Sequence, residues 1–155
     1  YIVLMAAADV PARAQVERAA RAHGLDVVDV MVSPEPATPL SATVEVLTPD
    51  AFVPGAHRWL ASERVVMSPS RAVPRLVGPE GMPEERLRGI VEAARRDTEA
   101  ARWLVWARYP YARVQPDGAG WLVRFGDARY DDRPESGGLG GLAVRLGPDL
   151  SVLPR

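Results

Sequence analysis

The chain contains neither cysteine nor lysine, and these two absences exclude several kinds of active site. Without cysteine there is no disulfide scaffold, thiol nucleophile, iron–sulfur cluster or Cys-based zinc site. Because all 19 basic residues are arginine, there is also no Schiff-base lysine, lysine general base or P-loop lysine. Any binding or chemistry must therefore use carboxylates, guanidinium groups, hydroxyls, aromatic rings and two imidazoles.

Histidine and net charge are equally scarce. His23 and His57 are the only imidazoles, and neither lies in an H-E-x-x-H or H-x-x-x-H frame. Since a catalytic transition metal needs three or more converging ligands, we expect no metal site and no cofactor within this chain. The 20 acidic residues against 19 basic ones leave a net charge of −1, which argues against a nucleic-acid partner.

What is present describes an ordinary globular chain. Of the 155 residues, 47% are hydrophobic and 25% are charged, which is typical of a packed domain. Most predicted strands come in pairs joined by short turns, so we expect an α+β fold with a mostly antiparallel sheet built from hairpins and packed against two or three helices. The sequence predicts a single soluble domain of this kind over residues 9–155.

Periodicity and turn residues divide that domain into elements. Pro54-Gly55 interrupts the second arm of the first predicted hairpin, which should make that arm an edge or bulged strand. The expected elements are a helix from Asp9 to Gly24, a strand over 27–32, a stiff proline-rich turn segment over 33–39, a hairpin over 42–53, a short strand over 65–67, a crossing loop over 68–81, one long helix from Pro83 to before Tyr109 with a kink near Asp97-Thr98, a hairpin over 111–125 and a strand over 142–146.

Residues 1–8 form an uninterrupted apolar run. A membrane-spanning helix needs about 20 such residues, so this run does not cross a bilayer by itself. It is either the end of a truncated membrane helix or the first packed segment of the domain. Arginines 13, 18 and 21 follow it directly, and the positive-inside rule would then place the rest of the chain on the cytoplasmic side.

Three short motifs suggest chemistry but favour plainer interpretations. Gly137–Gly141 is glycine-rich, yet a strand pattern follows it instead of the helix that a phosphate-binding loop requires. The carboxylates of Asp127 and Asp131-Asp132 could hold a divalent cation, although solvated loop charge accounts for them better. Ser136 has no nucleophile-elbow frame and no neighbouring histidine, so no catalytic residue is predicted.

The most distinctive feature is a pair of segments in which arginines alternate with aromatic residues. They are residues 106–111, with Arg108, and residues 125–130, with Asp127, Arg129 and Tyr130. In one interpretation Arg108 and Arg129 clamp an anion while Asp127 orients one of them, so these four are the anion- or substrate-binding candidates. In the other, an Arg–aromatic stack and an Asp–Arg bridge fix the helix end against the hairpin.

These segments and the stretch Ser33-Pro34 to Pro39-Leu40 resemble the C-terminal soluble portion of the inner-membrane metal-dependent hydrolases, also known as LexA-binding inner-membrane-associated hydrolases. The resemblance implies that a multi-span membrane part upstream carries the metal ligands. It also implies a divalent metal in that part, attachment to the cell inner membrane, and that residues 1–8 are the end of the last membrane helix with the rest a soluble domain attached to it. No metal ligand is carried over to this chain.

The leading functional expectation is therefore an accessory, noncatalytic domain of a membrane-bound hydrolase whose metal site lies outside this chain. A second hypothesis is a protein-interaction module that docks a cytosolic partner through exposed tryptophans, with Trp59, Trp103 and Trp121 as candidate anchors or, alternatively, as core residues. A third is a small-anion-binding domain built on Arg108, Asp127 and Arg129.

Overall fold

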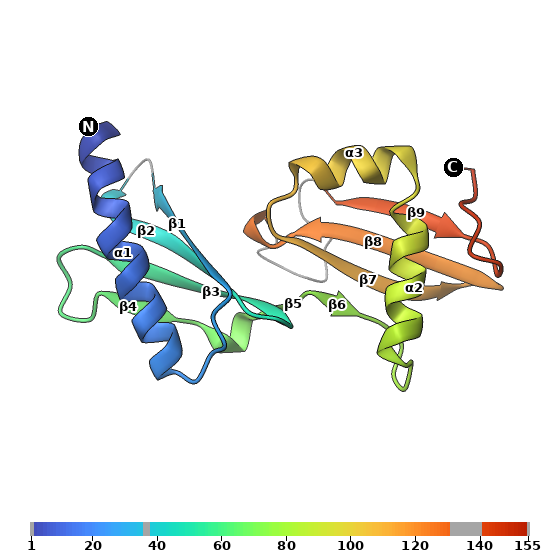
Figure 1. Ribbon diagram of the computed structural model, residues 1–155, viewed down its shortest axis with the longest axis horizontal. Helices are drawn as coiled ribbons and strands as arrows, with labels where there is room; N and C mark the ends of the chain where they lie inside the picture. The colour runs from blue at the N-terminus through green and yellow to red at the C-terminus, as the bar shows by residue number, and fades with distance from the viewer. Residues whose placement is uncertain (1, 36–37, 131–140, 155) are drawn as a thin grey trace. The chain divides into compact units, whose positions relative to one another are not determined.

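A computed structural model describes residues 2–35, 38–130 and 141–154. The chain packs as two compact units, Tyr1–Val73 and Pro74–Arg155. Each unit has its own sheet, drawn separately in Figure 1. The fold class is confirmed as α+β, because helices pack on sheets whose strands are mostly antiparallel.

The first unit is a five-stranded sheet with one helix, α1 (Ile2–Ala22). Its strands run in the order β1-β2-β3-β4, and β5 also pairs with β3. The predicted hairpin is confirmed as the pairing of β2 with β3 around a turn at residues 48–50. The strands are β1 (Asp29–Glu35), β2 (Thr38–Leu47), β3 (Ala51–Arg58), β4 (Val65–Met67) and β5 (Val73–Pro74).

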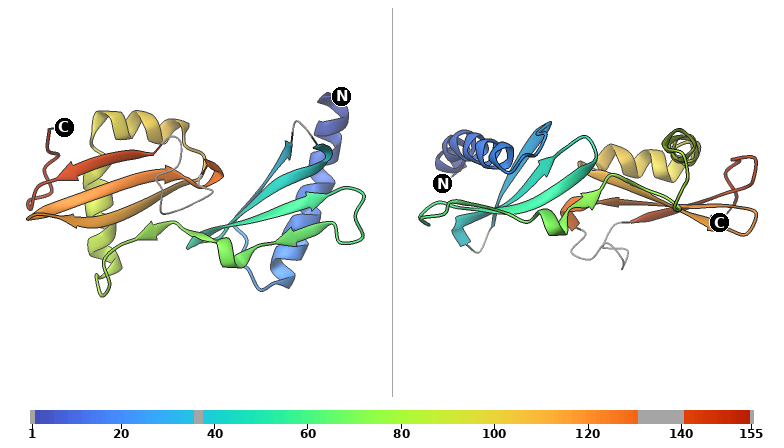
Figure 2. Two further views of the ribbon diagram at one scale, coloured as in Figure 1. Left: turned by 180° about the vertical axis from the view of Figure 1, so that it is seen from behind. Right: turned by 90° about the horizontal axis from the view of Figure 1, so that it is seen from below.

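Helix α1 packs against β1, β2 and β4 through one apolar stripe (Figures 1 and 2). Ala12, Val16 and Ala20 repeat every fourth residue, and all three are fully buried. The helix begins well before the predicted start at Asp9 and includes Pro11, but it ends as expected beside Gly24, whose φ of +78° suits a glycine after a helix. No helix in the described residues has both the length and the apolar character needed to cross a bilayer.

Two predictions for the prolines of this unit are wrong. The expected turn segment over 33–39 is mostly strand, because β1 continues through Pro34 to Glu35 and β2 begins at Thr38. The strand β3 is central and pairs continuously with β2 through Pro54, so it is neither bulged nor an edge. The carbonyl of Pro54 accepts from the amide of Ser68, beyond the end of β4, so the missing N–H costs no bond to β2.

The second unit has a four-stranded sheet in the order β6-β7-β8-β9 with two helices on one face (Figure 2). The β7–β8 hairpin and β9 confirm the predicted strands, whereas β6 runs parallel to β7 within the expected crossing loop. The elements are β6 (Leu76–Val77), α2 (Glu84–Ala94), α3 (Thr98–Trp106), β7 (Pro110–Asp117), β8 (Gly120–Asp127) and β9 (Leu142–Leu146).

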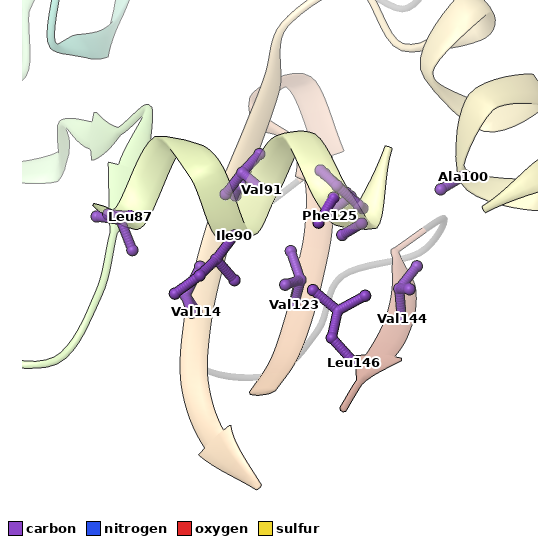
Figure 3. Close-up of a cluster of buried hydrophobic side chains, with 12 residues drawn as sticks. Leu87, Ile90, Val91, Ala100, Val114, Val123, Phe125, Val144 and Leu146 are labelled. Carbon is purple, nitrogen blue, oxygen red and sulfur yellow. The ribbon is translucent and has the colours of Figure 1, made fainter. Parts of the chain in front are cut away.

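The core of this unit lies between α2 and the sheet. Leu87, Ile90 and Val91 project from α2 onto the strands, where they meet apolar side chains from β7, β8 and β9 (Figure 3). Alternate strand residues supply that layer, as expected for a sheet with one covered face. The strand residues are Ala112, Val114, Val123, Phe125, Val144 and Leu146.

The single long helix predicted from Pro83 is two helices. The carboxylate of Asp97 accepts hydrogen bonds from the amides of Glu99 and Ala100, so Asp97 is the N-cap of α3 and the chain turns there. The predicted apolar stripe continues only in part past that turn, because Leu104 packs against the core whereas Ala101 is exposed and Val105 is 90% exposed. As a result, the end of α3 presents apolar side chains to solvent.

Candidate functional site

Asp127 is the centre of the arginine–aromatic cluster. It lies at the end of β8, and its side chain is only 1% exposed. Its Oδ2 accepts from the backbone amide of Arg108 at 2.9 Å and from Nη2 of Arg129 at 2.6 Å. Its Oδ1 accepts from the amide and the Nε of Arg129 at 3.1 and 3.0 Å. The Asp127 carboxylate therefore holds the segment after α3 through Oδ2 and the turn after β8 through both oxygens.

The electrostatics of the pair favour the charged forms of both groups. Burial raises the pKa of Asp127, but the hydrogen bonds from Arg129 and Arg108 outweigh it and leave that pKa below its usual value. The hydrogen bond to Asp127 in turn raises the pKa of Arg129. The amide of Ala128 also donates to the carbonyl of Tyr109 at 2.9 Å, which adds a second link across the same junction.

The guanidinium of Arg129 lies against two aromatic rings. Its Cζ is 5.4 Å from the ring centroid of Trp106 and 4.9 Å from that of Tyr130. The two rings stack on each other, with centroids 5.7 Å apart and planes inclined by 12°. Trp106 is 56% exposed and Tyr130 is 46% exposed. We call these two stacked rings the aromatic ledge.

The structure brings the four predicted site residues together, but in unequal roles. Asp127 and Arg129 form the buried ion pair, and Tyr130 belongs to the ledge. Arg108 reaches Asp127 with its backbone amide, and its side chain is exposed. This arrangement matches the bridge that fixes the helix end against the hairpin more closely than a clamp of two guanidinium groups.

Of the two interpretations of the tryptophans, the structure supports core packing for Trp103 and Trp121. Trp103 and Trp121 pack against the core of the second unit, and Trp59 is half-buried with its ring 4.3 Å from that of His57. Trp106 is the exposed one. Neither Trp103 nor Trp106 belongs to the predicted apolar stripe, so the sequence pattern alone does not separate the buried tryptophan from the exposed one.

No metal centre emerges from the part of the chain that the structure describes, where no three His, Asp or Glu side chains gather. His57 is fully buried on β3, with Nε2 3.2 Å from Oε1 of Gln15 on α1. Asp131-Asp132, the glycine run at 137–141 and Ser136, whose motifs the sequence raised and interpreted more plainly, lie wholly or largely outside the described residues.

Comparisons of the chain with protein-family models, with curated proteins and with solved structures find no match. The resemblance to inner-membrane hydrolases therefore stays a prediction from short motifs. A function for this chain is therefore inferred from the geometry around Asp127, Arg129 and the aromatic ledge.

Proposed function

We propose that this chain is a noncatalytic protein-binding module and that the aromatic ledge is its contact surface. The observation that carries the proposal is the stacked pair of Trp106 and Tyr130, both about half exposed and both held by Arg129. Tryptophan, tyrosine and arginine are the residues that most often dominate protein interfaces. A solvent-exposed tryptophan stacked in a fixed orientation loses little conformational entropy on binding.

The ion pair beneath the ledge favours this function over small-anion binding. Two of the donor nitrogens of Arg129 already bond to Asp127, whose negative charge would repel an anion at the same guanidinium. The same pair instead restrains the Arg129 side chain against the rings. The cluster thus supports the ledge, in the way that well-packed surroundings support an interface hot spot.

A peptide-library selection tests the proposal. A displayed library of random peptides is selected on the immobilised chain, and the binders are measured against Trp106→Ala, Tyr130→Ala and the control Val152→Ala, which alters an exposed apolar residue outside the ledge. We expect each ledge variant to lose at least about 2 kcal/mol of binding free energy and the control to lose little. Melting curves establish that all variants are folded. Selected binders that tolerate both ledge variants would contradict the proposal.

Attachment of such a module to a membrane-bound hydrolase is a separate prediction, and the ledge does not depend on it. A binding module and an accessory domain are compatible roles, because an accessory domain acts by holding a partner or substrate in place.

A further inference from the structure

Strand β9 lies at one edge of the sheet of the second unit, and the C-terminal tail occupies part of its free side (Figure 1). The amide of Leu153 donates to the carbonyl of Arg145 at 2.9 Å. Val152 forms an antiparallel bridge with Leu146. The tail therefore adds to the sheet as a very short strand, but only beside the last residues of β9.

The rest of the free side of β9 carries backbone groups without a hydrogen-bond partner. Because the Arg145 carbonyl bonds to the tail, the backbone groups of Arg145 point away from β8. Those of Ala143 point the same way, since backbone groups alternate in direction along an antiparallel strand. The amide of Arg145 and both backbone groups of Ala143 form no hydrogen bond with the described residues, and Ala143 is exposed. Two donors and one acceptor thus face outward at the spacing of a β-ladder.

Strand β1, at an edge of the other sheet, shows how such groups are blocked in this protein. The carbonyl of Val30 accepts from the Arg13 side chain, and its amide donates to Oδ1 of Asp29 at 2.8 Å. Pro34, further along the same side of β1, has no N–H group to offer. Side chains and a proline therefore protect β1 from pairing with a further strand, whereas Ala143 has no such protection.

A mostly apolar cavity of about 180 Å³ adjoins the open part of β9. Leu122, Ala143 and the tail residues Leu153 and Pro154 form part of its wall. A larger cavity of about 430 Å³ shares the tail residues and Asp97 with it and extends over the first turn of α3. The unpaired backbone groups therefore lie beside a space that can hold an apolar side chain.

We infer that β9 binds an extended peptide segment of another protein by strand addition. The peptide backbone would accept from the amides of Ala143 and Arg145 and donate to the carbonyl of Ala143, while an apolar side chain enters the adjoining cavity. In strand addition the main-chain hydrogen bonds supply affinity and the side-chain pockets supply specificity. This surface does not include the aromatic ledge, so the inference goes beyond the proposed function and does not depend on it.

A second copy of this chain could also pair through β9, but the open stretch fits a peptide better. The tail closes one end of that stretch and leaves only Ala143 and the amide of Arg145 unpaired. A short peptide needs the width of one strand, whereas a second copy would bring its own tail against that of the first. Self-association is therefore made an outcome of the test.

The experiment selects displayed random peptides on the wild-type chain, with Ala143→Pro as the counter-selection. Proline removes the outward amide without removing a bond to β8, and it is tolerated in an edge strand when its missing N–H faces solvent. Ala143→Thr is the matched control, since threonine keeps the amide and suits a strand. The selected peptides are then N-methylated one position at a time and measured on the wild-type chain, so this second readout does not depend on the folding of a variant.

We expect Ala143→Pro to weaken binding by at least about 10-fold and Ala143→Thr by less than about 3-fold. N-methylation should weaken binding at every second peptide position, because only alternate amides of an added strand face the edge. A selection that returns no peptide, peptides that bind Ala143→Pro as well as the wild type, or N-methyl effects without a two-residue period would each overturn the inference. Self-association of the wild type that Ala143→Pro abolishes, followed by ultracentrifugation, would overturn it in favour of a second copy.

Discussion

The phenol ring of Tyr111 lies directly over Gly126, its partner across the β7–β8 ladder. A Cβ atom at position 126 would lie 2.2 Å from Cζ and 2.3 Å from Oη of Tyr111. Tyr111 is buried, so its ring has little room to move away. Gly126 directly precedes Asp127, so this contact lies at the end of β8 that carries the arginine–aromatic cluster.

Gly126→Ala should therefore destabilise the chain by about 1–3 kcal/mol, the usual cost of overfilling a packed site. Gly89→Ala is the matched control, because a Cβ there meets no atom within 4 Å and alanine is the better helix former in α2. Urea denaturation of both variants measures the difference. Equal free energies of unfolding for the two would show that Tyr111 does not occupy this position.

Asp127→Asn should destabilise the second unit by about 2–4 kcal/mol, because it leaves the Arg129 guanidinium without its charged partner in a mostly buried place. Asp117→Asn is the control, since Asp117 pairs with Arg145 at 2.7 Å but both side chains are more exposed, and its loss should cost less than about 1 kcal/mol. Chemical denaturation compares the two. A cost for Asp127→Asn no larger than for the control would contradict the central role of the buried pair.

Acid should remove the extra stability that Asp127 gives the folded chain relative to asparagine at the same position. The pKa of Asp127 is lowered in the folded chain, so its stabilisation is complete above the ordinary value of 3.8 and is lost as the pH falls through the folded pKa. The difference in unfolding free energy between wild type and Asp127→Asn should narrow in that range. A difference that stays constant in acid would mean that the charge of Asp127 adds nothing.

His57 should make the first unit sensitive to mild acid. Burial, with the charge of Arg64 adding to it, lowers the pKa of His57, and its Nδ1 has no hydrogen-bond partner in the described structure. As the pH decreases below 6.5, the ordinary pKa of histidine, His57 takes up a proton in the unfolded chain before it does so in the folded chain. The free energy of unfolding therefore decreases as the pH is lowered, until the folded pKa is reached. His57→Gln should lose this dependence of stability on pH in thermal melts measured between neutral pH and mild acid, and an unchanged dependence would show that His57 is not its source.

Asp97→Ala should cost about 1 kcal/mol, because two amides at the start of α3 lose their acceptor. Asp97→Ser should restore most of that stability, since serine is also a good N-cap. Thermal unfolding of the three chains provides the comparison. If serine proved as costly as alanine, Asp97 would be acting through a contact other than the cap.

The sequence by itself determined the features that depend on near neighbours. The alternation of apolar residues predicted both hairpins and the strand over 142–146, and Gly24 marked the end of the first helix. The absence of cysteine and lysine excluded whole classes of chemistry without any structure. These inferences succeed because local periodicity and turn residues act over a few positions along the chain.

Only the tertiary structure decided which side chains are exposed and which elements pair. Pro54 is tolerated in the central strand β3 because its carbonyl bonds to Ser68 and its missing N–H costs no bond to β2. This depends on where β4 ends, which only the tertiary structure shows. Trp106 is 56% exposed, whereas Trp103, three residues earlier on the same helix, packs against the core. Burial is a property of contacts between distant segments, so a helical pattern identifies a stripe but not where a cap will end it.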